Sequence, residues 1–374
     1  MPPLARRNLF HDKIRFSVTL TGIVFSVVLI VVELGLFVGF TTATSGIIDH
    51  ARADLWIVSE HTPYIEQGTP FSERKLYQAL TVPGVATANK YIVRFASWKV
   101  PDGAEEGIQV VGFDPYSGVG GPWNVVEGNV EDLKTADAIM VDEIYKKKLG
   151  VTRAGEIFEI NGRRARVVGF TRGIRAFTTT PYVFTSFKNA QAYARLNEDQ
   201  TLFILVNAAP GADVKKLQRS LQARLTDVDV LTREQFSALT RFYWMFTTGA
   251  GIAVLIAAML GLVVGVVVVA QTIYATTMDH IREFGTLKAM GAANSYIYRV
   301  IITQAGISAV LGYAVAMVVS AFIVHASASG GAAIQTPWQM MAGIFFLSLA
   351  MCIGAALVSV NKVRHLDPAM VFKG

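Results

Sequence analysis

The sequence predicts an α-helical membrane domain of four transmembrane helices, with a mixed α/β domain inserted between helices 1 and 2. Hydrophobic residues make up 52% of the 374 residues, and charged residues make up only 17%. Ordinary soluble domains contain about 25% charged residues. Three tracts with at most one charge are each long enough to span a bilayer, which takes about 20 residues. A long segment of mixed polar and apolar composition separates the first tract from the second.

The three apolar tracts set the predicted order of domains. The first covers 16–40 and is interrupted only by Glu33, the second covers 242–278, and the third covers 300–361. A Ser-, Gly- and Ala-rich stretch at 325–338 divides the third tract into two spans. The predicted segments are an N-terminal segment 1–15, helix 16–40, α/β domain 41–241, helix with stalk 242–275, loop 276–298, helix 299–324, loop 325–338, helix 339–361 and C-terminal segment 362–374.

Lysine and arginine residues predict the orientation of these spans. They gather in the N-terminal segment, in loop 276–298 and in the C-terminal segment, whereas loop 325–338 has none. The positive-inside rule then predicts a multi-pass protein of the bacterial inner (cytoplasmic) membrane, with both termini and loop 276–298 in the cytoplasm. Acidic and basic residues nearly balance in 41–241, on the other side. The net charge of +6 is therefore an orientation signal, and no nucleic-acid partner is expected.

The inserted segment predicts two strand–helix–strand flanks around a strand-rich insert at about 104–190. Apolar alternation and cap residues place the flanking elements. Asn161-Gly162 predicts a tight hairpin inside the insert. Gly150 predicts the end of a short helix. The flanking elements are strand 53–59, helix 72–80 and strand 90–100, followed by strand 202–206, helix 212–225 and strand 227–231.

Motifs for chemistry are missing from the sequence. It contains no Gly-x-x-x-x-Gly-Lys-Ser/Thr phosphate loop and no zinc-type spacing of Cys and His. Its one cysteine, Cys352, falls inside the last predicted span, so no intrachain disulfide forms. Asp and Glu residues are plentiful in 41–241, but nothing pairs them for catalysis. We therefore expect no catalytic residue, metal site or cofactor on this chain.

Glu33 and two glycines stand out within the spans. A carboxylate inside a membrane is costly and suggests a function by default. Glu33 lies roughly 26 Å along the helix from residue 16, at 1.5 Å per residue, near the outer boundary. Two interpretations stay open: contact with water or with Thr247 or Thr248, or a role in a substrate path. Gly261 and Gly265 form a Gly-x-x-x-Gly motif, which predicts close helix packing.

A short charged helix is predicted at about 280–290, between the second and third spans. Asp279 is placed as its N-cap, Glu283 in its first turn and Lys288 in its last turn. Gly291 is placed as a left-handed C-cap. Two interpretations follow: an amphipathic helix on the membrane surface, or an element that docks on a partner.

Several segments resemble the MacB/FtsX type of ABC transporter permeases, also called type VII. Residues 282–292 read Arg-Glu-Phe-Gly-Thr-Leu-Lys-Ala-Met-Gly-Ala and are similar to this family's signature. Leu4–Leu9, Thr21–Ile23, Asn161–Phe170 and the ending Leu366–Phe372 are also similar, so the resemblance covers nearly the whole chain. The sequences of the signature and of Ala53–Trp56 are most similar to those of the DevC-like branch. The chain differs from MacB in lacking an ATPase domain.

The resemblance implies a homodimeric permease subunit of an ABC export system. A separate ATPase dimer would bind ATP and Mg, and the permease would convert hydrolysis into movement of its periplasmic domain. A periplasmic adaptor (membrane fusion protein), an outer-membrane channel and membrane lipid are implied partners, and a lipid, glycolipid, peptide or drug-like molecule is the implied substrate. An FtsX-like regulator of cell-wall hydrolases and a lipoprotein-releasing permease are the alternatives. The implied coupling residues are Arg282, Glu283, Phe284, Gly285, Leu287, Lys288, Met290 and Gly291.

Overall fold

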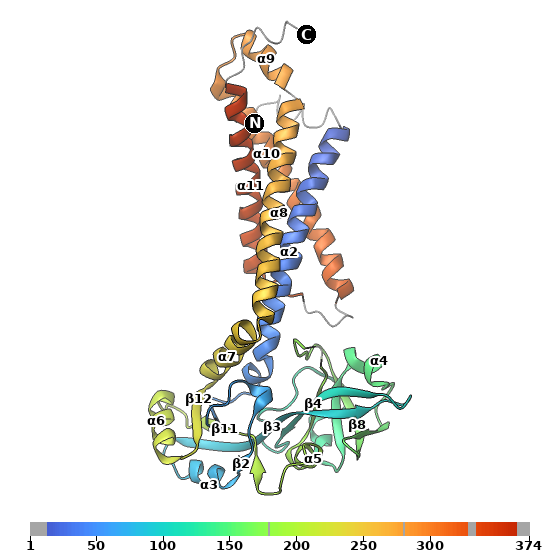
Figure 1. Cartoon of the computed structure of the whole chain (residues 1–374), viewed down its shortest axis with the longest axis vertical. Helices are drawn as coiled ribbons and strands as arrows, with labels where there is room; N and C mark the ends of the chain where they lie inside the picture. Colours follow the sequence, from blue (N-terminus) through green and yellow to red (C-terminus); the bar gives the residue numbers. More distant parts are fainter. Residues whose placement is uncertain (1–12, 179, 280, 328–333, 365–374) are drawn as a thin grey trace. The chain divides into compact units, whose positions relative to one another are not determined.

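The computed structural model describes residues 13–178, 180–279, 281–327 and 334–364 (Figure 1). Contacts divide the chain into two compact units. The membrane unit comprises residues 1–38, 252–328 and 334–374, and the inserted unit comprises mainly residues 39–251. The sequence features at Leu4–Leu9, at Leu366–Phe372 and in the 328–333 part of the predicted loop lie outside the described residues.

Four long helices build the membrane unit (Figure 1): α2 (Lys13–Asp49), α8 (Ala250–Asp279), α10 (Asn294–Ser327) and α11 (Trp338–Arg364). Within the described residues, these four helices are long and apolar enough to cross a membrane. This confirms the four predicted spans. The short helix α9 (Ile281–Ala289) lies in the chain between α8 and α10.

The helices that contain the first two predicted spans have other bounds than those spans. Helix α2 continues to Asp49, beyond the predicted span 16–40, and within this extension the Thr44 hydroxyl donates to the Phe40 carbonyl at 2.7 Å. The tract that starts at 242 is divided. Helix α7 (Arg233–Phe242) and the π-helix η4 (Tyr243–Thr247) come first, and Gly249, with φ of 75°, separates them from α8.

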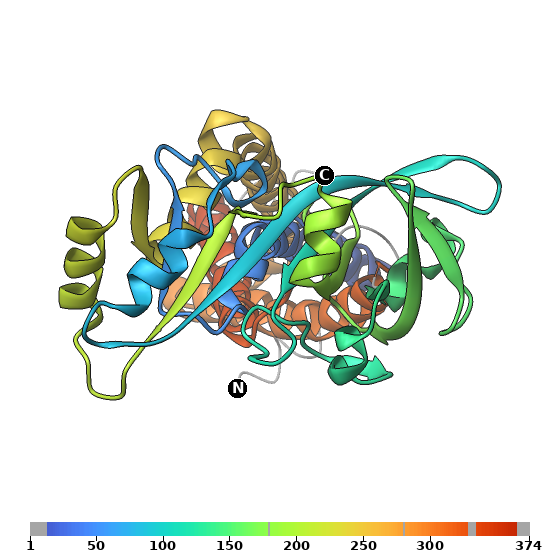
Figure 2. The same cartoon turned by 90° about the horizontal axis from the view of Figure 1, so that it is seen from below.

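The inserted unit is built on a ten-stranded mixed sheet, with strand order β12-β1-β11-β3-β4-β9-β6-β8-β5 and β7 pairing with β3 and β8. Strands β2 and β10 form a separate two-stranded sheet. The long β3 joins the two halves of the large sheet and runs across Figure 2 in blue to cyan. The strands are β1 (Leu55–Ser59), β2 (Phe71–Ser72), β3 (Val85–Lys99), β4 (Glu105–Phe113), β5 (Val125–Glu127), β6 (Ala138–Asp142), β7 (Ile157–Ile160), β8 (Arg163–Thr171), β9 (Tyr182–Ser186), β10 (Gln200–Thr201), β11 (Phe203–Ala208) and β12 (Val228–Thr232).

Short helices complete the inserted unit. Those predicted at 72–80 and 212–225 are present with small shifts, as is the short helix that ends at Gly150, which has φ of 69°. The first begins at Arg74, because Phe71 and Ser72 pair with β10 and are extended. The helices are α3 (Arg74–Leu80), α4 (Lys146–Leu149), α5 (Phe187–Tyr193) and α6 (Val214–Arg224), with the 3-10 turns η1 (Ile65–Gln67), η2 (Val130–Lys134) and η3 (Glu143–Tyr145).

Alternation along the central strands produces two separate cores. On β1, Leu55 and Ile57 point to one face, where they pack with Leu217 and Leu221 of α6. Trp56 and its alternating neighbours point to the other face, where the core includes Ile47 and Ile48 of α2 and Phe236 of α7. Covered faces on both sides explain why this strand reads as a nearly continuous apolar run in the sequence.

The predicted hairpin is confirmed in detail. Asn161 and Gly162 connect β7 to β8 and have φ of 49° and 81°, as a two-residue turn of type I′ requires. The Asn161 side chain also fixes the hairpin to its surroundings, since its amide donates to the Tyr193 carbonyl at 2.8 Å.

Candidate functional site

Helix α9 ends as the glycine at position 291 predicts. Gly291 has φ of 91°, the left-handed conformation that favours glycine. The Ala292 amide donates to the Leu287 carbonyl at 3.0 Å, and the Gly291 amide donates to the Lys288 carbonyl at 3.0 Å. This pair of bonds is a Schellman motif, which satisfies the last carbonyls and stops the helix at a defined residue. Helix α9 therefore has a well-defined C-terminal end.

The exposed side chains of α9 follow one stripe. Glu283 and Thr286 of α9 and Met290, the first residue after the helix, are three and four positions apart and exposed, and Met290 is 71% exposed. Gly285 is buried on the opposite side, and Leu287 is half-buried against the core of the membrane unit. The backbone of Arg282 and Phe284 lies in α9, and their side chains lie outside the described set. One face of α9 thus packs against the membrane unit, and another face is exposed.

Two positions differ from their expected roles. Asp279 is the last residue of α8 and lies within that helix, so it does not have the extended backbone of an N-cap. Gly285, one of the implied coupling residues, is buried within this chain and so presents little surface. Glu283, Thr286 and Met290 are the exposed positions among the described side chains of this segment.

Glu33 faces the glycine motif of α8. A Cβ atom at Gly261 would lie 2.9 Å from Glu33 Cγ, and one at Gly265 would lie 2.9 Å from Ile30 Cδ1. Further along the same two helices, the hydroxyls of Thr19 in α2 and Thr276 in α8 share a hydrogen bond at 2.8 Å. The α2–α8 seam, as we call these contacts, is antiparallel and close because the two glycines lack side chains.

The seam gives Glu33 a neighbour that the sequence did not suggest. Residue numbers fall along α8 as they rise along α2, so Gly261 is level with Glu33, and Thr247 and Thr248 are about a dozen positions further along. Glu33 is half-buried, with its aliphatic stem over Gly261. Neither a water-filled path nor an ionic partner for its carboxylate is among the contacts of the described residues.

Glu66 is a buried carboxyl group that the sequence interpretation missed. It lies in η1 and is only 8% exposed. Burial raises the pKa of the Glu66 carboxyl to about 7, and the nearby Trp244 indole partly opposes this shift. Among the described residues, neither Glu66 Oε2 nor Trp244 Nε1 has a hydrogen bond of good geometry. No local pattern marks this position, because its burial comes from residues far away in the sequence.

Aromatic rings surround this region of the inserted unit. Tyr64, two residues before Glu66, stacks on Tyr243 of η4 with ring centroids 4.0 Å apart. Trp244 of η4 packs edge-on against Phe177 at 4.4 Å, and Phe177 packs against Phe40 of α2 at 5.2 Å. The π-helix therefore places two aromatic residues beside the buried carboxyl group.

The raised pKa of Glu66 predicts a pH-dependent stability. The unfolded carboxyl titrates near 4.5 and the folded one near 7, so its stabilising contribution is complete below pH 4.5 and is lost as the pH rises through 7. We expect Glu66→Gln to raise the free energy of unfolding by on the order of 2–3 kcal/mol at pH 8 and to change it little at pH 4.5. Thermal unfolding of the purified full chain at both pH values measures this. Glu60→Gln, at an exposed position, is the matched control; equal pH dependence in Glu66→Gln and the wild type would contradict the prediction.

Metal-ligating side chains do not converge in the described residues: no group of three or more His, Cys, Asp or Glu could hold an ion there. Cys352 is fully buried in α11.

Family comparisons identify the class of protein. Residues 16–224 match the family model described as the MacB-like periplasmic core domain, and residues 255–368 match the one described as the FtsX-like permease C-terminal. Together with the four apolar helices and the inserted α/β domain, these matches define a multi-pass membrane permease. The chain belongs to the MacB/FtsX type of ABC transporter permeases.

Relatives of similar length carry the same family name. Two proteins of Mycobacterium tuberculosis (strain ATCC 25618 / H37Rv), each named an uncharacterized ABC transporter permease, align along almost their whole length. One is 22% identical over 363 residues, which is 96% of this chain and 95% of that protein. The other is 24% identical over 391 residues, 99% of each. A similarly named protein of Methanocaldococcus jannaschii is 22% identical over 239 residues, 59% of this chain and 58% of that protein.

Solved structures show a distant likeness. The periplasmic region of MacB from Actinobacillus actinomycetemcomitans aligns with a TM-score of 0.39 and 11% identity, over 50% of this chain and 92% of that chain. The extracellular domain of the noncanonic ABC-type transporter YknZ from Gram-positive bacteria aligns with a TM-score of 0.37 and 13% identity, over 48% of this chain and 98% of that chain.

Proposed function

We propose that this chain is the permease subunit of an export system in which a separate ATPase dimer drives conformational change of the inserted unit. The observation that carries the proposal is α9, a helix with a defined end that lies between two spanning helices and exposes Glu283, Thr286 and Met290. Its exposed residues and its packed face suit a helix held by the permease and received by a second protein. The ATPase would supply the ATP and Mg sites.

The proposal extends to the partners and surroundings of the subunit. The sequence of the signature is similar to that of DevC-like permeases. This similarity supports a homodimer in the bacterial inner membrane that works with a periplasmic adaptor and an outer-membrane channel. The exported molecule would be a lipid, glycolipid, peptide or drug-like compound, since such molecules enter from or near the membrane. An FtsX-like regulator and a lipoprotein-releasing permease remain the alternatives, and they differ from export in what the inserted unit acts on.

Reconstitution tests the coupling proposal. The purified chain is placed in proteoliposomes with the ATPase encoded next to its gene, and ATP hydrolysis is compared with that of the ATPase alone. We expect the permease to stimulate hydrolysis and to form a stable complex with the ATPase. An ATPase that neither binds the chain nor changes its rate would overturn the proposal. Regulation would be indicated if hydrolysis is stimulated while a purified cell-wall hydrolase, rather than an exported molecule, responds.

The proposed orientation has a labelling test. Asn197 of the inserted unit and Ser295 of α10 are exposed, and the only native cysteine is fully buried. We expect Asn197→Cys to react with an impermeant maleimide in intact spheroplasts and Ser295→Cys to react only after the membrane is opened. The unsubstituted chain serves as the blank. Labelling of Ser295→Cys from outside would reverse the positive-inside assignment.

A further inference from the structure

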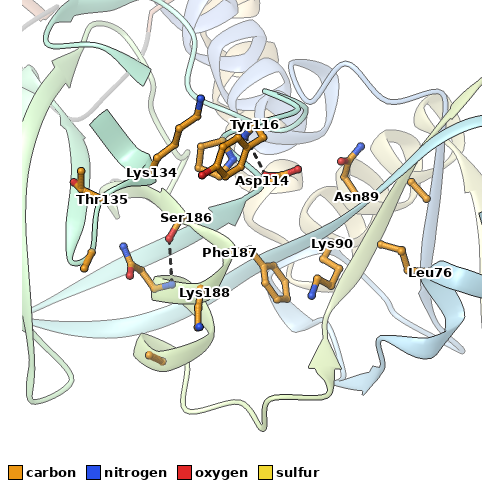
Figure 3. Close-up of a pocket in the computed structure, with 15 residues that line it drawn as sticks. Leu76, Asn89, Lys90, Asp114, Tyr116, Lys134, Thr135, Ser186, Phe187 and Lys188 are labelled. Carbon is orange, nitrogen blue, oxygen red and sulfur yellow. Dashed lines mark hydrogen bonds between the residues drawn. The ribbon is translucent and has the colours of Figure 1, made fainter. Parts of the chain in front are cut away.

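A cavity of about 720 Å³ lies in the inserted unit at the point where β3 changes its neighbour (Figure 3). Strand β3 pairs with β11 over Val85–Tyr91 and with β4 over Ile92–Lys99. Strand β4 ends at Phe113, so the chain leaves the sheet there and Asp114–Tyr116 form one wall of the cavity. The parallel strand β9 ends beside it at Ser186, and the start of α5 forms another wall. Ligands commonly bind outside the carboxyl ends of parallel strands, as β4 and β9 are here.

Lysine residues dominate the charge of this cavity. Lys90, Lys134 and Lys188 line it together with a single acidic residue, Asp114. Asp114 is engaged locally, since its Oδ1 accepts the Tyr116 amide at 3.0 Å (Figure 3). The lining therefore favours an anion.

Two of the lysines are held over aromatic rings. The Lys90 ammonium lies 4.6 Å from the centroid of Phe187, and the Lys134 ammonium lies 4.5 Å from the centroid of Tyr116. Each also pairs with a carboxylate outside the lining, Glu73 and Glu131 respectively. The Lys134–Glu131 pair is exposed, and such pairs contribute only about 0–1 kcal/mol, so a ligand anion can replace Glu131 there. The Lys90–Glu73 pair is partly buried, and a ligand anion can share the Lys90 ammonium with Glu73 because an ammonium has three donors. The rings add apolar surface beside each positive charge.

Lys188 and Asn89 supply donors for which the described residues hold no acceptor. Lys188 is exposed on α5, and no ion pair or hydrogen bond of its ammonium is found in the described residues. Asn89 is only 8% exposed, and its Nδ2 has no acceptor in the described residues. A buried donor without an acceptor costs about 1–3 kcal/mol. An oxygen atom of a ligand in this cavity would satisfy the Asn89 donor.

From these residues we infer that the inserted unit binds a small anionic molecule in this cavity, one that carries a phosphate or carboxylate on an apolar body. The lysines and Asn89 suit the oxygens, whereas Phe187, Tyr116 and Leu76 suit the apolar body. The volume suits a molecule larger than an inorganic ion, because sites for drug-sized ligands measure about 300–1,000 Å³. The binding needs no ATPase, so it stands or falls independently of the coupling by α9.

The test measures binding of 4-methylumbelliferyl phosphate to the purified full chain in a neutral detergent, by equilibrium dialysis. The uncharged 4-methylumbelliferyl glucoside is the matched probe. We expect saturable binding of the phosphate, at least about tenfold weaker binding of the glucoside, and weakening with added salt. Lys188→Ala should weaken phosphate binding by about fivefold or more, and Lys188→Glu should abolish it. Lys147→Ala removes the same charge at an exposed position outside the cavity and should change nothing.

A competition arm separates the two sources of such an anion. Dihexanoyl phosphatidic acid that displaces the aryl phosphate assigns the cavity to a phospholipid headgroup, and failure to displace assigns it to soluble anions; both results support an anion site. Absence of saturable binding of both probes would overturn the inference. So would equal loss of binding in Lys188→Ala and Lys147→Ala. Thermal unfolding of each variant confirms that it is folded.

Discussion

Replacing Gly265 by Leu is expected to destabilise the membrane unit by about 1–3 kcal/mol, the usual range for overpacking a close contact. A Cβ atom there would already lie 2.9 Å from Ile30 Cδ1 and 3.5 Å from the Ser26 carbonyl oxygen. The remaining carbons of leucine extend beyond the Cβ atom, and Ile30 is only 1% exposed, so either the Ile30 side chain shifts within the core or α2 and α8 separate and weaken the α2–α8 seam. Helix propensity acts in the opposite direction, but Gly to Leu gains at most about 1 kcal/mol. The steric clash therefore outweighs the gain in helix propensity, and the net effect on stability is destabilising.

The measurement is the thermal midpoint of the detergent-purified chain, followed by size-exclusion chromatography after heating. Gly354→Leu is the matched control, because a Cβ atom there meets nothing within 4 Å in the described residues. Only the propensity gain should remain in that control. Gly261→Leu should resemble Gly265→Leu, since its Cβ atom would meet Glu33. If both variants keep the wild-type midpoint but change the oligomeric state, the glycines serve contacts between chains instead of the seam.

Local sequence patterns predicted those elements that are determined by residues close together in the sequence. The four apolar helices follow from length and composition, the hairpin from Asn161-Gly162, and the end of α9 from Gly291. In each case the deciding physics acts within a few residues: burial of an apolar run, or a backbone conformation that glycine and asparagine adopt at low cost.

Features that depend on distant residues were not predictable in this way. Gly249 interrupts the second tract, and the lack of charged residues from 242 to 278 concealed this break. The neighbour of Glu33 depends on the register of two helices more than two hundred positions apart in sequence. The burial of Glu66 and the gathering of Lys90, Lys134 and Lys188 around one cavity arise only when separate strands and turns pack together. The burial of Gly285 was likewise not predictable from the residues next to it in the sequence.

Reversing the charge of Glu283 is expected to abolish stimulation of the ATPase by the permease, and with it transport. Glu283 is exposed in the first turn of α9, and its stripe includes the strongly exposed Met290. A carboxylate near a helix N-terminus is favoured by the helix dipole, and it offers an acceptor to basic groups of a partner. A lysine in its place brings like charges together, which costs several kcal/mol at an interface. We expect at least about a thirtyfold loss of affinity for the ATPase, corresponding to about 2 kcal/mol.

Three variants and one control make this result specific to a docking surface. Glu283→Gln, which keeps the shape and loses the charge, should lie between the wild type and Glu283→Lys. Met290→Asp should also weaken binding, because it puts a charge on the apolar end of the exposed stripe. Glu198→Lys makes the same charge change at an exposed position of the inserted unit and should bind and stimulate the ATPase normally. If α9 instead lies on the membrane surface, Glu283→Lys would strengthen its attachment to anionic lipid vesicles and leave ATP hydrolysis unchanged, because added basic charge favours such surfaces. That outcome would remove α9 from the coupling pathway.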